Sequence, residues 1–99
     1  MDNKIDYKIK VGKKSIDKSI TLKELSWPEW CKIQDIQLVL SNPNGALFTN
    51  ASNYVQIHLG KTDEEMIAWR DGYDIYGEFQ AEIFILTRAI TESYNTKKK

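Results

Sequence analysis

The four residues Ser26-Trp27-Pro28-Glu29 constrain the fold of this chain more than any other short stretch. A serine followed three residues later by a glutamate is a capping box, in which each side chain binds the backbone amide of the other residue. Proline suits the first turn of a helix, where its missing N–H is not needed. We expect a helix that begins after Ser26 and runs to about Leu40, before the helix-breaking residues at 41–45.

The residues before this corner predict a β-hairpin over residues 5–22. Apolar and polar side chains alternate over residues 5–11, which is typical of a half-buried strand. Gly12 supplies a turn, and the alternation resumes over residues 15–22 with one interruption at Lys18. A two-stranded ribbon is only marginally stable in water, so we expect it to pack on helices.

The helix after the corner carries a broad apolar arc. At 100° per residue the arc contains two tryptophans, the single cysteine and several aliphatic side chains: Trp27, Trp30, Cys31, Leu38, Ile33, Ile36 and Leu40. An arc this wide predicts that the helix is central. Tryptophans at a strand-to-helix corner are usually part of the core, and we expect that here.

Residues 46–60 fit two structures. A helix that ends at Gly60 would gather Ala51, Tyr54 and His58 on one side, whereas a strand would use the alternation around Ile57. We favour the helix because of its length and its terminal glycine.

Two more helices are expected after Gly60. Thr62-Asp63-Glu64-Glu65 is a second capping box and starts a short helix that ends near Asp71. Asp74 is expected to cap a final helix that runs to about Tyr94. Its apolar stripe consists of Ile75, Phe79, Ile83, Leu86 and Ile90. Phe84 and Ile85 fall outside the stripe and have no evident intramolecular partner, so they are candidates for a partner surface.

Together these elements predict one α+β domain, mainly helical, over residues 1–96. The β-hairpin at 5–22 would pack on a bundle of three to four helices within 26–94, and the lysines at 97–99 would form a disordered tail. With 41% apolar residues in a chain of 99, one compact core can form without a disulfide or a metal.

The sequence offers little catalytic chemistry. Cys31 is the only cysteine and His58 the only histidine; we expect a buried Cys31 and a polar or half-buried His58. No zinc-type spacing, phosphate-binding glycine loop or nucleophile motif is present. The acidic run at 71–78 lacks the ligand pattern of an EF-hand loop. We therefore expect a binding protein rather than an enzyme, with no cofactor and no metal.

The charge pattern and the absence of long apolar runs limit the kinds of partner that we expect. No segment reaches the roughly 20 apolar residues of a membrane span, and the N-terminus lacks a signal peptide, so we expect a cytoplasmic protein without a membrane partner. Lysines are in excess over residues 1–32, but they are interleaved with acids and no RNA-binding motif is present. Nucleic acid is not expected as a partner. The sequence leaves homo-oligomer formation open.

A resemblance to a known family centres on Thr21-Leu22-Lys23-Glu24-Leu25-Ser26. This segment is similar to the Thr-Leu-x-Glu-Leu-Ser type sequence that ends the short β-ribbon of lambda-like phage tail assembly chaperones. The looser resemblance covers about residues 5–34, but neither the Trp-Pro-Glu-Trp corner at 27–30 nor the final helix maps onto the family. Membership would imply a non-enzymatic protein of the host cytoplasm that binds and solubilises the tape-measure protein during tail morphogenesis. Family members are often made in two lengths by a frameshift, and the terminal lysines are compatible with this.

Under this resemblance, the first candidates for contact with a protein partner are Phe84, Ile85 and Tyr94. Trp27 and Trp30 follow if the corner is exposed. The alternative is that these side chains fill the core. Two other functions stay open: a small structural virion or assembly protein, and a regulator that acts by protein–protein contact, such as an inhibitor of host defence.

Overall fold

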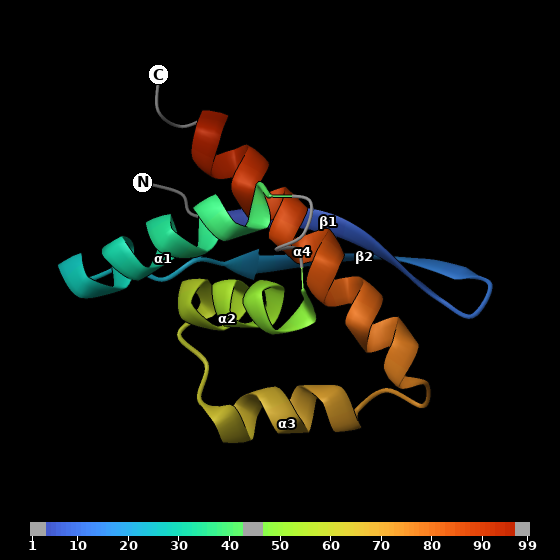
Figure 1. Ribbon diagram of the computed structural model, residues 1–99. Coiled ribbons are helices and arrows are strands. Elements are labelled where there is room, and N and C mark those ends of the chain that lie inside the picture. Colours follow the sequence, from blue (N-terminus) through green and yellow to red (C-terminus); the bar gives the residue numbers. More distant parts are fainter. Residues whose placement is uncertain (1–3, 43–46, 97–99) are drawn as a thin grey trace.

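The computed structural model describes residues 4–42 and 47–96, and for residues 94–96 it describes the backbone alone. A β-hairpin is followed by four helices (Figure 1). The elements are β1 (Lys4–Val11), β2 (Lys14–Thr21), α1 (Trp27–Leu40), α2 (Phe48–Leu59), α3 (Asp63–Asp71) and α4 (Tyr76–Thr96). The predicted class, α+β and mainly helical, is confirmed. The tail predicted at residues 97–99 lies outside the described residues.

The hairpin has the position that the alternating sequence predicts. β1 and β2 pair antiparallel, with Ile5 opposite Ile20 and Tyr7 opposite Lys18. The strands are joined at Gly12, whose φ of 64° lies in the left-handed region that glycine adopts at little cost.

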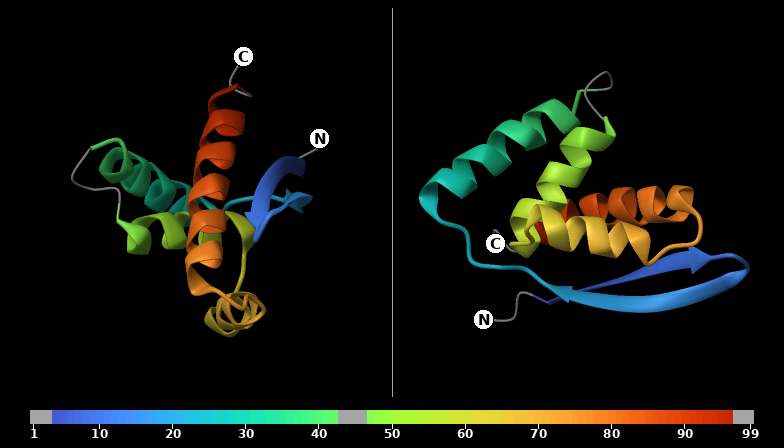
Figure 2. Two further views of the ribbon diagram at one scale, coloured as in Figure 1. Left: turned by 90° about the vertical axis from the view of Figure 1, so that its right-hand side faces the viewer. Right: turned by 90° about the horizontal axis from the view of Figure 1, so that it is seen from below.

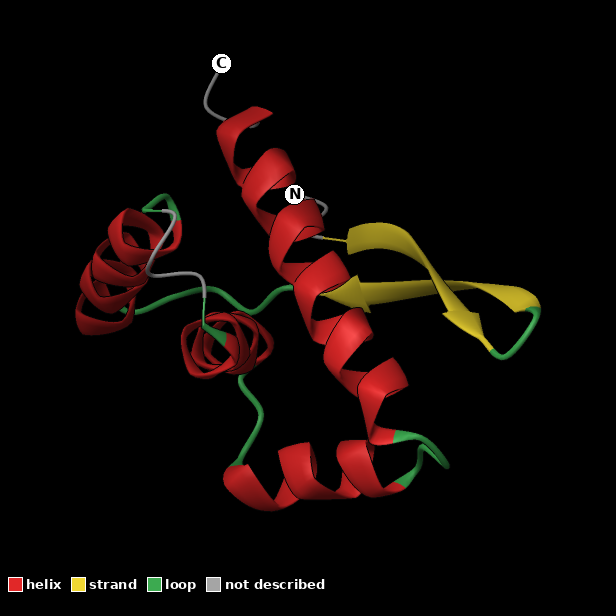
Figure 3. Cartoon of the chain, turned by 45° about the vertical axis from the view of Figure 1, so that its right-hand side comes forward, coloured by secondary structure: helices red, strands yellow, loops and turns green. Residues whose placement is uncertain are grey.

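Helix α4 lies at the centre of the molecule. The hairpin lies on one side of it, and α1 and α2 lie on the other (Figure 3). Its buried residues include four of the five in the predicted stripe: Phe79, Ile83, Leu86 and Ile90. They form the core with Ile5, Tyr7 and Ile9 of β1, Ile33 and Ile36 of α1, and Ala51, Tyr54 and Val55 of α2.

The start of α4 differs from the prediction. The helix begins at Tyr76 rather than directly after Asp74, and Ile75 is exposed. The carbonyl of Ile75 accepts a hydrogen bond of 3.0 Å from the amide of Glu78. Because Ile75 precedes the first helical residue, the helical spacing that placed it in the stripe does not apply to it.

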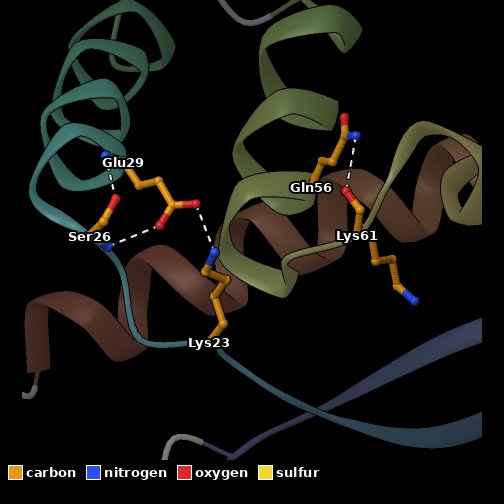
Figure 4. Close-up of polar contacts among 5 residues, drawn as sticks. All are labelled: Lys23, Ser26, Glu29, Gln56 and Lys61. Carbon is orange, nitrogen blue, oxygen red and sulfur yellow. Dashed lines mark hydrogen bonds and ion pairs between the residues drawn. The ribbon is translucent and has the colours of Figure 1, made fainter.

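The predicted cap of α1 is present. The amide of Ser26 donates to Glu29 Oε1 at 2.9 Å, and the amide of Glu29 donates to Ser26 Oγ at 3.4 Å. Lys23 Nζ lies 2.7 Å from Glu29 Oε2 (Figure 4). The bond from Lys23, followed by that from the Ser26 amide, lowers the pKa of Glu29 to about 2.

The same corner contacts the end of α2. The amide of Lys23 donates to the carbonyl of His58 at 2.8 Å. Helix α2 ends before Gly60, whose φ is 67°, so the predicted helix is confirmed and the strand alternative is wrong. A Cβ atom at Gly60 would lie 2.7 Å from Lys23 Cδ, which shows how closely the two segments approach.

Hydrogen bonds between residues close in sequence also fix the link from α2 to α3. Gln56 Nε2 donates to the carbonyl of Lys61 at 3.1 Å (Figure 4). The second capping box is confirmed: Thr62 and Glu65 bind each other's backbone amides, at 3.1 and 2.8 Å. The short helix ends at Asp71, as predicted.

Helix α1 is not central, which corrects the prediction from its apolar arc. It packs mainly on α2, and only Ile33 and Ile36 of the arc are buried. Trp27 and Leu38 are each 72% exposed, and Trp30 is also exposed. A helix with one main neighbour buries a narrow stripe, so the rest of the broad arc is exposed or half-buried. In two further views, α1 and α4 extend from α2 in different directions (Figure 2).

Candidate functional site

A groove of about 650 Å³ lies between α1 and α4. Side chains at the C-terminal end of α1 form one wall: Gln34, Gln37, Leu38, Leu40 and the cap residue Ser41. The middle of α4 forms the other wall, with Phe84, Thr87, Arg88, Thr91 and Glu92. The volume falls within the roughly 300–1,000 Å³ of ligand-binding sites in proteins.

The two tryptophans extend the α1 wall of this groove. Helical spacing puts Trp27 and Trp30 on the same face as Gln34 and Leu38, one to two turns nearer the N-terminus. Their rings stack with centroids 5.4 Å apart. Both are exposed, so the expectation that they belong to the core is wrong. Over its whole length of about 21 Å, α1 therefore presents one mixed aromatic, aliphatic and polar face.

Phe84 and Ile85 face different regions. Phe84 lines the groove and is 40% exposed, and its ring contacts that of Phe48 edge-on at 5.9 Å. The expectation that it has no intramolecular partner is therefore wrong. Ile85 lines a separate hollow of about 400 Å³ beside β1, which Phe84 borders as well. The side chain of Tyr94 lies outside the described part of the chain.

A hydrogen-bonded layer lies beneath the groove. The hydroxyl of Tyr54, a buried residue of α2, accepts a hydrogen bond of 3.1 Å from Gln37 Nε2 and another of 3.1 Å from Thr91 Oγ1. One buried phenol thus joins the two walls. The sequence reasoning missed Gln37 and Thr91. The sequence gives little indication of their role, because polar residues next to apolar ones are common on any amphipathic helix.

On the hairpin side of α4, Glu82 is buried with 0% exposure. Its Oε2 atom accepts hydrogen bonds from the Tyr7 hydroxyl at 2.6 Å and from Lys18 Nζ at 2.8 Å. Its Oε1 atom accepts one from the hydroxyl of Tyr73. Burial, followed by the bond to Glu82, raises the pKa of both Tyr7 and Tyr73.

This cluster fastens the hairpin to the helices. At the hairpin tip, the amide of Gly12 donates to Glu78 Oε2 at 2.7 Å, which adds a second attachment to α4. Sequence reasoning missed Glu82 as well, although a carboxylate adjacent to the buried Ile83 was a usable signal. Because every described partner belongs to the fold's own framework, we interpret the cluster as structural.

The two residues considered for nucleophilic chemistry differ from expectation. Cys31 is half-buried rather than buried, because the outer part of α1 is not covered. His58 is buried rather than polar or half-buried, and its ring lies edge-on to Tyr54 at 4.7 Å. Removal from water lowers the pKa of His58 to about 4, so the imidazole is neutral at physiological pH.

Among the described residues, no group of three or more His, Cys, Asp or Glu side chains could hold a metal ion. Within the same part of the chain, no helix is long and apolar enough to cross a membrane. Comparison with protein-family models, with curated proteins and with solved structures finds no match to this chain.

Proposed function

We propose that this protein is a non-enzymatic phage tail assembly chaperone whose α1–α4 groove holds apolar helical segments of the tape-measure protein. The observation that carries the proposal is the exposed apolar surface of the groove, above all Leu38 at 72% and Phe84 at 40% exposure. Exposed apolar side chains gathered in a groove are typical of protein-binding sites. The resemblance of Thr21–Ser26 to the chaperone family supplies the identity of the partner.

The groove suits a helix that presents one apolar stripe. Leu38 and Leu40 on one wall and Phe84 on the other would cover apolar side chains at successive turns of the client. Full burial of one such side chain is worth roughly 1.5–3 kcal/mol, and association offsets part of that gain. A few such contacts give weak, reversible binding, as a chaperone that leaves the finished tail requires.

Trp27 and Trp30 would lengthen the contact. They lie on the groove face of α1, towards its N-terminus, so a client helix could follow α1 for about 14 residues, or roughly 21 Å. Aromatic side chains supply large contact areas at small entropic cost.

The acidic surface would keep the complex in solution and favour a basic client. Asp63, Glu64 and Glu65 lie together in the first turn of α3, outside the groove. Exposed charge of one sign discourages aggregation and steers partners of the opposite sign.

Co-expression tests the proposal. The protein would be produced together with the long helical protein encoded directly downstream, and the soluble, co-purified fraction of that protein would be measured. We expect wild-type protein to solubilise it and Leu38→Glu to fail. Ile67→Glu is the matched control, because Ile67 is also exposed but lies on α3, outside the groove. Equal solubilisation by both variants would contradict the assignment of the groove.

Mass spectrometry of purified particles tests the chaperone role separately. A chaperone is absent from finished tails. Detection of this protein in stoichiometric amount would instead support the alternative of a structural virion protein.

A further inference from the structure

The groove between α1 and α4 is not uniformly apolar. Besides Leu38 and Phe84, its lining includes Gln37, which carries a carboxamide, and Thr87 and Thr91, which carry hydroxyls. An occupant that covers these groups removes their water, and each group must then find a new hydrogen bond or weaken binding. Among helices whose apolar side chains fit the groove, those that also form hydrogen bonds with these polar groups should therefore bind more tightly.

Gln37 has the largest unused hydrogen-bonding capacity of the three. A carboxamide offers two N–H donors and one carbonyl oxygen. Within the described part of the chain, the side chain of Gln37 makes a single hydrogen bond, from Nε2 to Tyr54. One N–H and the carbonyl Oε1 therefore remain for an occupant of the groove.

The two threonines add acceptors. Thr87 Oγ1 donates its hydrogen to the carbonyl of Ile83 at 2.8 Å. Thr91 has one hydroxyl hydrogen, and both the Tyr54 hydroxyl, at 3.1 Å, and the carbonyl of Thr87, at 2.8 Å, lie within its reach. A hydroxyl whose hydrogen is used within the protein can still accept a hydrogen bond on its other side. This face of α4 therefore needs donors from the partner.

Only some side chains satisfy this set. A carboxamide can donate to Gln37 Oε1 and accept from the remaining Gln37 N–H in a reciprocal pair, and its second N–H can reach a threonine oxygen. A carboxylate cannot donate, an ammonium group cannot accept, and a leucine can do neither.

We propose that the groove recognises an amphipathic client helix that carries Asn or Gln in the middle of its apolar stripe, paired with the carboxamide of Gln37. This inference rests on the proposed function and specifies the chemistry of its partner. A single polar residue within an apolar seam fixes the register of two helices, because any shift leaves that residue unpaired.

The test uses the full-length protein and two stapled helical peptides of about 18 residues, long enough for several turns. Both are built from Leu, Ala and Lys, and they differ only in a central Asn or Leu within the apolar stripe. Fluorescence anisotropy gives the dissociation constants. We expect the Asn peptide to bind about fivefold tighter, as one net hydrogen bond allows.

Protein variants identify the partner of the Asn side chain. Gln37→Leu should reverse the preference, and Gln37→Met should do the same if the leucine variant folds poorly. Gln80→Leu is the matched control, because Gln80 is exposed on α4 outside the groove lining, and it should keep the wild-type preference.

Equal affinity for the two peptides, a preference for Leu, or no binding of either would overturn the inference. A preference for Asn that persists in both Gln37 variants would overturn it as well. If Leu38-dependent solubilisation of the tape-measure protein occurs without a preference for Asn, the chaperone proposal stands and this inference fails. A Gln37-dependent preference without any solubilisation upholds the groove chemistry and overturns the chaperone proposal.

Discussion

The two sides of α4 use polar side chains in opposite ways. On the hairpin side, Glu82 is fully buried and accepts hydrogen bonds from Tyr7, Lys18 and Tyr73. On the groove side, Gln37 makes one side-chain hydrogen bond to the described residues and lies beside the exposed Leu38. A buried carboxylate is tolerated only when its partners are complete, because unpaired charge in a core is costly. The hydrogen bonds of Glu82 therefore maintain the fold, whereas the unused hydrogen-bonding groups of Gln37 are available for binding.

Removal of Glu82 gives the largest expected effect. Glu82→Ala leaves the hydroxyls of the buried Tyr7 and the half-buried Tyr73, and also Lys18, without their acceptor, and we expect a loss of about 3–5 kcal/mol in the free energy of unfolding. Urea denaturation measures it. Glu64→Ala, at an exposed site in α3, is the control and should leave stability nearly unchanged. If the two variants were equally stable, the Glu82 cluster would not hold the hairpin on α4.

His58 is a second buried titratable residue, and its burial lowers the pKa of its imidazole. Its pKa falls from 6.5 to about 4 on folding, so the unfolded chain takes up the proton first as the pH decreases. The contribution of the neutral His58 to the free energy of unfolding is therefore fully present above pH 6.5 and is lost as the pH falls towards 4. Between pH 7 and pH 5 we expect this loss to be about 2 kcal/mol.

Urea denaturation at several pH values between 7 and 5 checks this prediction. In that range the lowered carboxyl pKa values of Glu29, Glu65 and Asp71 contribute little, because those groups stay ionised. His58→Gln should flatten the dependence. An unchanged slope in that variant would assign the pH effect to another group.

Tyr54 lies where the core meets the groove. Tyr54→Phe removes the hydroxyl that accepts from Gln37 and Thr91, and we expect a loss of about 1 kcal/mol in stability. Tyr76→Phe is the control, because the hydroxyl of Tyr76 donates a long, exposed hydrogen bond of 3.3 Å to Asp71. Thermal denaturation compares the two. Identical midpoints would show that the layer beneath the groove adds no stability.

The groove wall should give the smallest effect on folding. Leu38→Glu replaces a side chain that is already 72% exposed, so the free energy of unfolding should change by less than about 0.5 kcal/mol. Circular dichroism during urea denaturation measures it. A loss of several kcal/mol would mean that Leu38 supports the fold, and the co-expression result could not then be assigned to binding.

Features determined by neighbouring residues were predictable from the sequence. The capping boxes at Ser26 and Thr62 and the glycines at 12 and 60 fix the ends of elements through contacts within a few residues, and all four were predicted correctly. Helix amphipathicity likewise revealed the buried face of α4, apart from Ile75.

Features that depend on distant residues were not predictable. Whether α1 or α4 is central depends on which elements pack on each, and the broad arc of α1 gave the wrong answer. The partners of Glu82 on β1 and β2 are Tyr7 and Lys18, 75 and 64 residues away, which no spacing rule detects. The groove itself arises because α1 and α4 both pack on α2.

Photo-crosslinking tests most directly whether the α1–α4 groove contacts the tape-measure protein. A photoreactive amino acid would replace Leu38, or Ile67 as the control, in protein co-expressed with the downstream helical protein. The groove assignment predicts a crosslinked adduct with that protein from position 38 and none from position 67. No adduct from position 38, or equal adducts from both positions, would contradict it.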